Sequence, residues 1–178
     1  MRIKNTATHF GVVAILLHWI VAILIIGLLA VGLYMVRLPI SLEKLKLYGW
    51  HKEYGFLVLF LAVFRLVWRL ANQLPELSAL PLLEKIAARS MHWAFYGFMF
   101  AMPITGWLIT SAAGLPASFF GLFTLPNLIA PDAHNLVLFE WIHQWLAYAL
   151  IAAIGLHTAA ALKHHFINKD DILKRMIS

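Results

Sequence analysis

The chain has no cysteine and few charged residues, and these absences exclude several kinds of chemistry. Without cysteine there is no disulfide, no iron–sulfur cluster and no thiolate nucleophile. Only 12% of the 178 residues are Asp, Glu, Lys or Arg, whereas 62% are hydrophobic. This composition is typical of a membrane protein and not of a soluble domain.

Four apolar segments are long enough to cross a bilayer as helices, which takes about 20 residues. They cover approximately residues 11–36, 50–71, 91–113 and 138–163. No internal repeat or domain boundary interrupts them, so we expect residues 1–178 to form one all-α membrane domain, a four-helix bundle. The aromatic-rich segment 118–128 is too short to span, and we expect an interfacial or re-entrant piece in the long loop before the fourth helix.

Basic residues are distributed unevenly over the predicted loops. With a cytoplasmic N-terminus, ten lie on the inner side: Arg2, Lys4, Arg65, Arg69, Lys85, Arg89, Lys163, Lys169, Lys174 and Arg175. Four lie on the outer side: Arg37, Lys44, Lys46 and Lys52. This bias follows the positive-inside rule and predicts that both termini are cytoplasmic. The net charge of +6 therefore reflects topology in a lipid membrane, and we expect no nucleic-acid partner.

Two histidines of the fourth segment, His143 and His157, lie fourteen residues apart. They share nearly one helix face, with roughly 21 Å between them along the axis. In the predicted topology His157 matches the depth of His18 near the inner side, and His143 matches His51 near the outer side. An unpaired imidazole is costly inside a membrane, whereas two facing imidazoles can ligate a haem iron. We therefore expect two haems, of the non-covalent b type because cysteine is absent; hydrogen bonding between helices is the alternative.

Further polar residues of the inner half are candidates for binding a quinone or haem propionates: Arg65, Arg69, His92, His164 and His165. For the arginines, the alternative is snorkelling to the lipid headgroups. For His92, the alternative to quinone binding is a role at the protein surface. The two C-terminal histidines either cap the helix dipole or deliver protons to the quinone.

Several motifs resemble the bacterial cytochrome b561 family, in the same order along the chain. They are Leu17-His-Trp19, Trp50-His-Lys-Glu-Tyr-Gly55, Phe64-Arg-Leu-Val-Trp-Arg69, Met102-Pro-Ile-Thr-Gly106, Ile142-His-Gln-Trp145 and the segment Gly155 to Met176. The resemblance covers nearly the whole chain and implies a dihaem, four-helix cytochrome of the bacterial inner membrane. It implies the same four axial ligands: His18, His51, His143 and His157.

The family includes superoxide oxidases, which pass electrons from superoxide to ubiquinone, and cytochrome subunits of hydrogenases and other dehydrogenases. We favour a superoxide:ubiquinone oxidoreductase that takes electrons on the periplasmic side and acts by outer-sphere transfer. Lys44, Lys46 and Lys52, close to His51 in sequence, are candidates for steering the superoxide anion, with helix anchoring as the alternative. The competing functions are an electron-transfer subunit for a dehydrogenase, hydrogenase or other periplasmic redox partner, and a haem-free structural protein.

Overall fold

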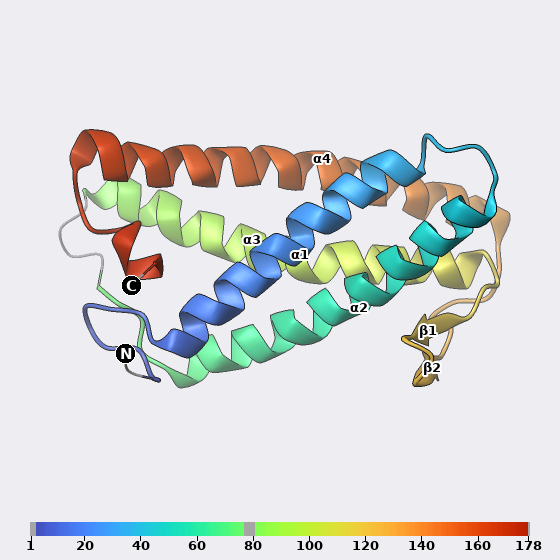
Figure 1. Cartoon of the computed structure of the whole chain (residues 1–178), viewed down its shortest axis with the longest axis horizontal. Helices are drawn as coiled ribbons and strands as arrows, with labels where there is room; N and C mark the ends of the chain where they lie inside the picture. The colour runs from blue at the N-terminus through green and yellow to red at the C-terminus, as the bar shows by residue number, and fades with distance from the viewer. Residues whose placement is uncertain (1–2, 77–80, 178) are drawn as a thin grey trace.

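The computed structural model describes residues 3–76 and 81–177, and its four long helices form a bundle (Figure 1). The helices are α1 (Val12–Met35), α2 (Leu42–Ala71), α3 (Leu82–Ala112) and α4 (Ala133–Lys163). A π-helix, η1 (His164–Asn168), continues α4, and a short 3-10 helix, η2 (Lys174–Met176), follows it. All four long helices have the length and composition to cross a membrane, so the four predicted spans are confirmed.

Helices α2, α3 and α4 begin five to nine residues before the apolar segments that predicted them. The additional turns carry charged residues such as Glu43 and Glu84, so a hydropathy pattern omits them although the helical backbone continues. Capping sets two of these starting points. The side chains of Ser41 and Asp132 each accept a hydrogen bond from a backbone N–H three residues further on.

The helices alternate in direction, so both termini lie at one end of the bundle (Figure 1). We call this the terminal end, formed by residues 3–11, 72–76 and 169–177, and the opposite one the hairpin end, formed by residues 36–41 and 113–132. Close backbone contacts join α1 to α2, α2 to α3, and α3 to α4. Along the described chain α4 approaches α1 and α2 less closely than it approaches α3.

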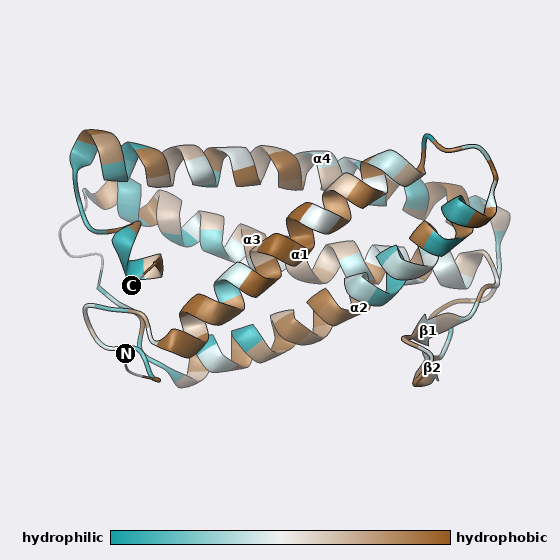
Figure 2. Ribbon diagram, in the orientation of Figure 1, coloured by the Kyte–Doolittle hydropathy of each residue, from teal (hydrophilic) through white to brown (hydrophobic). Residues whose placement is uncertain are grey.

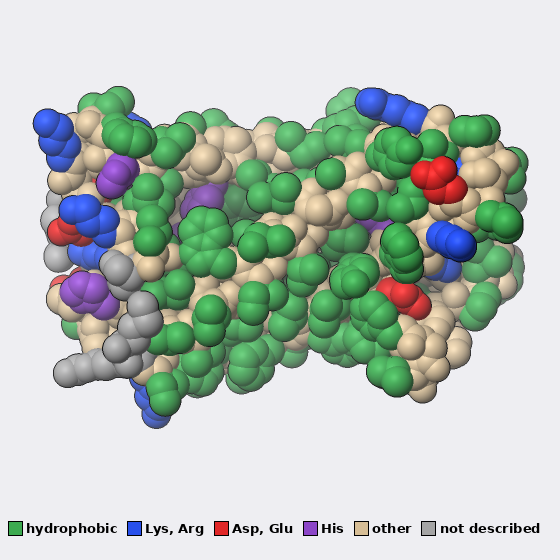
Figure 3. Space-filling view, in the orientation of Figure 1, with side chains coloured by type: hydrophobic (Ala, Val, Ile, Leu, Met, Phe, Trp, Pro, Cys, Tyr) green, Lys and Arg blue, Asp and Glu red, His purple; other side chains and the backbone are tan. Residues whose placement is uncertain are grey.

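The surface matches a lipid environment. Hydrophobic residues dominate the middle of the helices (Figure 2), and charged side chains gather at the two ends of the molecule (Figure 3). Large apolar side chains face outward, among them Ile23, which is 67% exposed, and Leu156, which is 65% exposed. Apolar surface of this extent is stable in hydrocarbon, not in water.

The predicted interfacial segment of the long loop forms a β-hairpin. Its antiparallel strands are β1 (Ala117–Phe119) and β2 (Phe123–Leu125). The turn places Phe120 and Gly121 at φ values of 48° and 69°, as a type I′ hairpin turn requires. The Phe120 ring contacts Tyr54 of α2, with 5.3 Å between centroids. The hairpin therefore rests on the bundle through its aromatic side chains.

The tightest core is contributed by three helices and lies between two levels of histidine. Its buried side chains are Val21, Ala62, Tyr96 and Met99. Along α1, Val21 lies between His18 and Gly32, and Gly32 is the point at which the His51 ring approaches α1. Helix α4 adds none of these four side chains, and its histidines face the other helices instead.

Candidate functional site

Four of the predicted residues meet in two pairs. The rings of His18 on α1 and His157 on α4 have centroids 6.3 Å apart, with 59° between their planes. The rings of His51 on α2 and His143 on α4 have centroids 6.2 Å apart at 73°. Among the described residues no hydrogen bond joins the two rings of either pair. The space between the rings is thus wider than a direct interhelical hydrogen bond would leave.

The separation within each pair suits a metal ion placed between the rings. An imidazole nitrogen lies about 2.0–2.1 Å from a bound metal, so two rings on opposite sides of one ion have centroids roughly 6 Å apart. The described residues contain no group of three or more His, Cys, Asp or Glu that could hold a metal ion. Two imidazoles suffice for a haem, because the porphyrin supplies the other four ligands. The donor set fits haem.

Both pairs bridge helices that are less closely packed in the described chain than consecutive helices are, α1 with α4 and α2 with α4. A flat macrocycle needs such a separation between the two ligand-bearing helices. Helices α3 and α4, by contrast, are the most closely packed pair in the bundle.

Two glycines bring helix backbone against the hairpin-end pair. A Cβ atom at Gly32 would lie 3.2 Å from Cε1 of His51, and one at Gly106 would lie 3.5 Å from Cε1 of His143. The Thr105 hydroxyl lies 2.9 Å from Nδ1 of His143, whereas Nδ1 of His51 is buried without a hydrogen-bond partner. The close approach at Gly32 and the hydrogen bond with Thr105 limit where the two rings can lie. Thr105 and Gly106 belong to the motif Met102-Pro-Ile-Thr-Gly106, whereas no sequence motif pointed to Gly32.

A third histidine joins the terminal-end pair. The ring of His92 on α3 lies 6.3 Å from that of His157. His92 was expected at the opening of the third helix, but α3 begins at Leu82, so His92 lies almost three turns inside it. The longer helix accounts for the difference. His92 therefore contacts the pair and does not have the surface position that was the alternative.

Arg65 also reaches the terminal-end pair and governs the protonation of His18. One guanidinium nitrogen of Arg65 lies 3.0 Å from Nδ1 of His18. A guanidinium can only donate, so this Nδ1 carries no proton and the proton resides on Nε2. A metal bound at Nε2 would leave the proton on Nδ1, which is incompatible with this contact. Arg65 must turn away whenever His18 binds a metal in this manner.

The other predicted quinone residues lie nearer the terminal end. The Arg69 guanidinium lies 5.7 Å from the Trp93 ring centroid and 5.6 Å from that of Tyr96, so aromatic rings of α3 hold it. Nδ1 of His165 is buried without a hydrogen-bond partner. Arg69 thus has inward contacts and His165 is partly buried, so neither shows the fully solvated position of a surface cation.

His164 has two carboxylates beside its ring. Its Nδ1 lies 2.6 Å from a carboxylate oxygen of Asp170, and its Nε2 lies 3.9 Å from Glu84. Lys163 donates to the other oxygen of Glu84 at 3.0 Å. Asp170 comes into reach because α4 ends in the π-helix η1 and the chain then turns at Lys169, whose φ is 54°. Helix capping alone does not describe this cluster, and only the fold reveals the two carboxylates.

The three lysines considered for superoxide steering are not gathered in one cluster. The Lys44 ammonium donates to the backbone carbonyl of Leu38 at 2.8 Å and lies over the Tyr48 ring. Lys46 is exposed and Lys52 is half-buried. Residues two apart on a helix point to different sides, so Lys44 and Lys46 do not share a face.

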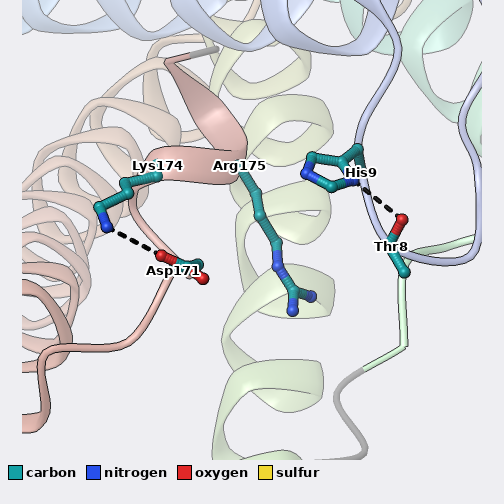
Figure 4. A pocket seen from close by; sticks show the side chains of 5 residues that line it. All are labelled: Thr8, His9, Asp171, Lys174 and Arg175. Atoms are coloured by element: carbon teal, nitrogen blue, oxygen red, sulfur yellow. Dashed lines mark hydrogen bonds and ion pairs between the residues drawn. The ribbon is translucent and has the colours of Figure 1, made fainter.

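A pocket at the terminal end lies between the N-terminal segment and η2 (Figure 4). His9 and Thr8 are joined by a hydrogen bond of 2.9 Å. Lys174 donates to Asp171 at 2.9 Å, and this bond with its positive charge lowers the pKa of the exposed Asp171 carboxyl. Arg175 donates to the backbone carbonyl of Glu76. Of these contacts, that of Arg175 joins distant parts of the chain. None of the residues that line the pocket belongs to an imidazole pair.

The fold and the paired imidazoles define the class of protein, a multi-pass membrane protein whose paired histidines fit haem. The chain belongs to the prokaryotic cytochrome b561 family, whose model matches residues 9–178. Haem b is the cofactor that this family implies. The expected family and the membrane location are thereby confirmed.

Three relatives show how far the similarity extends. Cytochrome b561 homolog 2 of Escherichia coli (strain K12) is 37% identical, over 99% of this chain and 95% of its own length. Cytochrome b561 homolog 1 of the same strain is 28% identical, over 95% of this chain and 97% of its own. A protein of Yersinia pestis named probable superoxide oxidase CybB is 30% identical, over 71% of this chain and 72% of its own.

Proposed function

We propose that residues 1–178 form one dihaem domain that passes electrons from superoxide to ubiquinone. The axial pairs are His18 with His157 and His51 with His143. The observation that carries this proposal is the presence of two imidazole pairs with ring centroids 6.3 Å and 6.2 Å apart, roughly 21 Å from each other along α4. Haem held between these imidazoles would supply one-electron redox chemistry.

The bundle is oriented with its terminal end in the cytoplasm and its hairpin end in the periplasm. The distribution of Lys and Arg supports this orientation through the positive-inside rule. Of the ten basic residues assigned to the cytoplasmic side, Arg2 lies outside the described residues. Electrons then enter near His51 and His143 and leave near His18 and His157.

The overall reaction joins a one-electron donor to a two-electron acceptor. Two superoxide anions, one ubiquinone and two protons give two molecules of dioxygen and one ubiquinol. The chain therefore needs a surface that attracts a small anion and, at the other end, groups that supply protons. The Yersinia relative named probable superoxide oxidase supports this reaction for the family.

The lysines of α2 near the hairpin end attract the superoxide anion. Lys46 is exposed and Lys52 follows His51 directly, half-buried. The Lys44 ammonium already donates to a backbone carbonyl, so it contributes positive charge but little direct contact with superoxide. Four basic and four acidic residues balance on this side of the membrane, so the steering comes from the local charge of these lysines. That local charge raises the encounter rate of superoxide with the protein, and salt weakens the effect.

The quinone binds near the terminal end. Arg65, Arg69 and His92 contact the region of the His18–His157 pair and can bind a quinone carbonyl or a haem propionate. His164 and His165 lie beyond them toward the cytoplasm and deliver the two protons. The carboxylates beside His164 support this role, because they connect its ring to exposed groups at the surface.

Stopped-flow reduction of the purified protein by superoxide, with and without ubiquinone, tests the function. We expect fast haem reduction, ubiquinol formation and two haems per chain by pigment analysis. Reduction no faster than that of an unrelated bis-histidine cytochrome, together with a co-purifying dehydrogenase or hydrogenase, would instead identify an electron-transfer subunit. Fewer than two haems per chain would refute the dihaem assignment, and a colourless protein would indicate a structural role.

A further inference from the structure

Thr105 of α3 contacts only one of the four paired histidines. Its hydroxyl oxygen lies 2.9 Å from Nδ1 of His143, and the residue is only 8% exposed. The contact joins α3 to α4 in the hydrophobic interior. In such surroundings a hydrogen bond between two side chains is strong and its geometry well defined.

The Thr105 hydroxyl has a single proton, and its neighbours determine where that proton lies. The oxygen is 2.8 Å from the backbone carbonyl of Ala101 and 2.9 Å from that of Met102. Carbonyl oxygens can only accept, so the hydroxyl proton points to them. Toward His143 the hydroxyl can therefore only accept, and Nδ1 of His143 must donate. The neutral ring then has its lone pair on Nε2.

The other paired histidines lack an acceptor of this kind. Nδ1 of His51 is buried without a partner. Nδ1 of His18 faces Arg65, which is a donor. Within the described residues, no hydrogen bond to the His157 ring is present. His143 is thus the one ligand candidate already held in the tautomer that leaves Nε2 free for a metal.

We propose that Thr105 is a positioning residue for the hairpin-end haem, setting the tautomer of His143 and lowering the reduction potential of that haem. The inference rests on the proposed ligation by His143. An imidazole that donates from Nδ1 is a more basic ligand at Nε2 and stabilises the oxidised iron.

Redox titration of the purified holoprotein tests this role with Thr105→Val, which keeps the shape and removes the hydroxyl. We expect one haem to become easier to reduce by about tenfold in its oxidised-to-reduced equilibrium, or about 59 mV for one electron. The other haem should keep its potential. Thr105→Ser should behave as the original protein because it restores the acceptor.

Thr110→Val is the matched control. Thr110 is also buried on α3, and its hydroxyl donates to the Gly106 carbonyl at 3.0 Å without touching a histidine. If Thr105→Val retains both haems and both potentials equal those of the control, the role of Thr105 is refuted. Should the valine variant not accumulate in the membrane, Thr105→Ala carries the same expectation.

A separate variant distinguishes failure of this inference from failure of the ligation. His143→Ala should lose one haem per chain, and retention of both would refute the proposed ligand set whatever Thr105 does. His51→Ala, with the terminal-end haem retained, assigns each measured potential to its site. Loss of one haem in Thr105→Val, with two in Thr105→Ser, also supports the positioning role.

Discussion

Replacement of Gly32 by alanine should disturb the hairpin-end haem alone. The new Cβ atom would lie 3.2 Å from Cε1 of His51, whereas ordinary contacts of this type are 3.4–4 Å. The ring or the helix must therefore shift by a few tenths of an ångström. Such overpacking typically costs about 1–3 kcal/mol, which offsets the gain of up to about 1 kcal/mol from removing a helical glycine.

Two other glycines provide matched controls. Gly106→Ala places a Cβ atom 3.5 Å from Cε1 of His143, an ordinary contact, and Gly27→Ala meets nothing within 4 Å. Both substitutions gain the same helix propensity as Gly32→Ala without forcing a ring to move. The three variants thus differ mainly in how closely the new methyl group approaches a histidine.

Electron paramagnetic resonance of the oxidised protein is the suitable assay, because the g values of low-spin ferric haem depend on the relative orientation of the axial imidazole planes. We expect Gly32→Ala to shift the signal of one haem and to accelerate its loss to a haem-binding protein. The signal of the other haem should be unchanged, as should both signals in the controls. A Gly32→Ala spectrum identical to that of Gly27→Ala would show that the close contact does not position His51.

Three further outcomes concern the terminal end and the entry of electrons. His18→Ala should lose one haem and His92→Ala should keep two, because α3 packs too closely on α4 to leave room for a macrocycle between their histidines. Pigment analysis of the purified variants measures the number of haems per chain. The reverse pattern would assign ligation to His92. His164→Gln should slow ubiquinol formation at least about 100-fold without loss of haem, because general acid catalysis typically contributes about that much or more. Unchanged turnover would exclude His164 from proton delivery. Lys46→Glu should slow haem reduction by superoxide at low salt but not reduction by dithionite, and an equal rate with superoxide would remove the steering role.

Helical periodicity accounts for the part of the site that was predictable. Fourteen residues are almost four turns, so His143 and His157 had to share one face of a long apolar helix. The cost of an isolated imidazole in a membrane then required partners at two depths, and the alternation of spans identified His18 and His51. Hydropathy located the four spans for the same reason, since the bilayer demands continuous apolar helix.

The surroundings of each ring depended on tertiary packing. Rotation of one helix about its axis relative to the next brings Thr105 to His143, Gly32 to His51 and His92 to His157. Periodicity within a single helix does not specify these rotations, because they result from the shapes of side chains on all the helices together.

The ends of the helices likewise depend partly on local sequence and partly on tertiary contacts. Charged turns extend α2 and α3 beyond the apolar segments, and a β-hairpin forms where an interfacial or re-entrant piece was expected. Local composition records how much of the chain enters lipid, while the length of each helix and the folding of its loops depend on caps and contacts formed with other segments. The pairing of the four histidines was thus contained in spacing and depth, whereas their hydrogen-bond partners are decided only when the four helices pack.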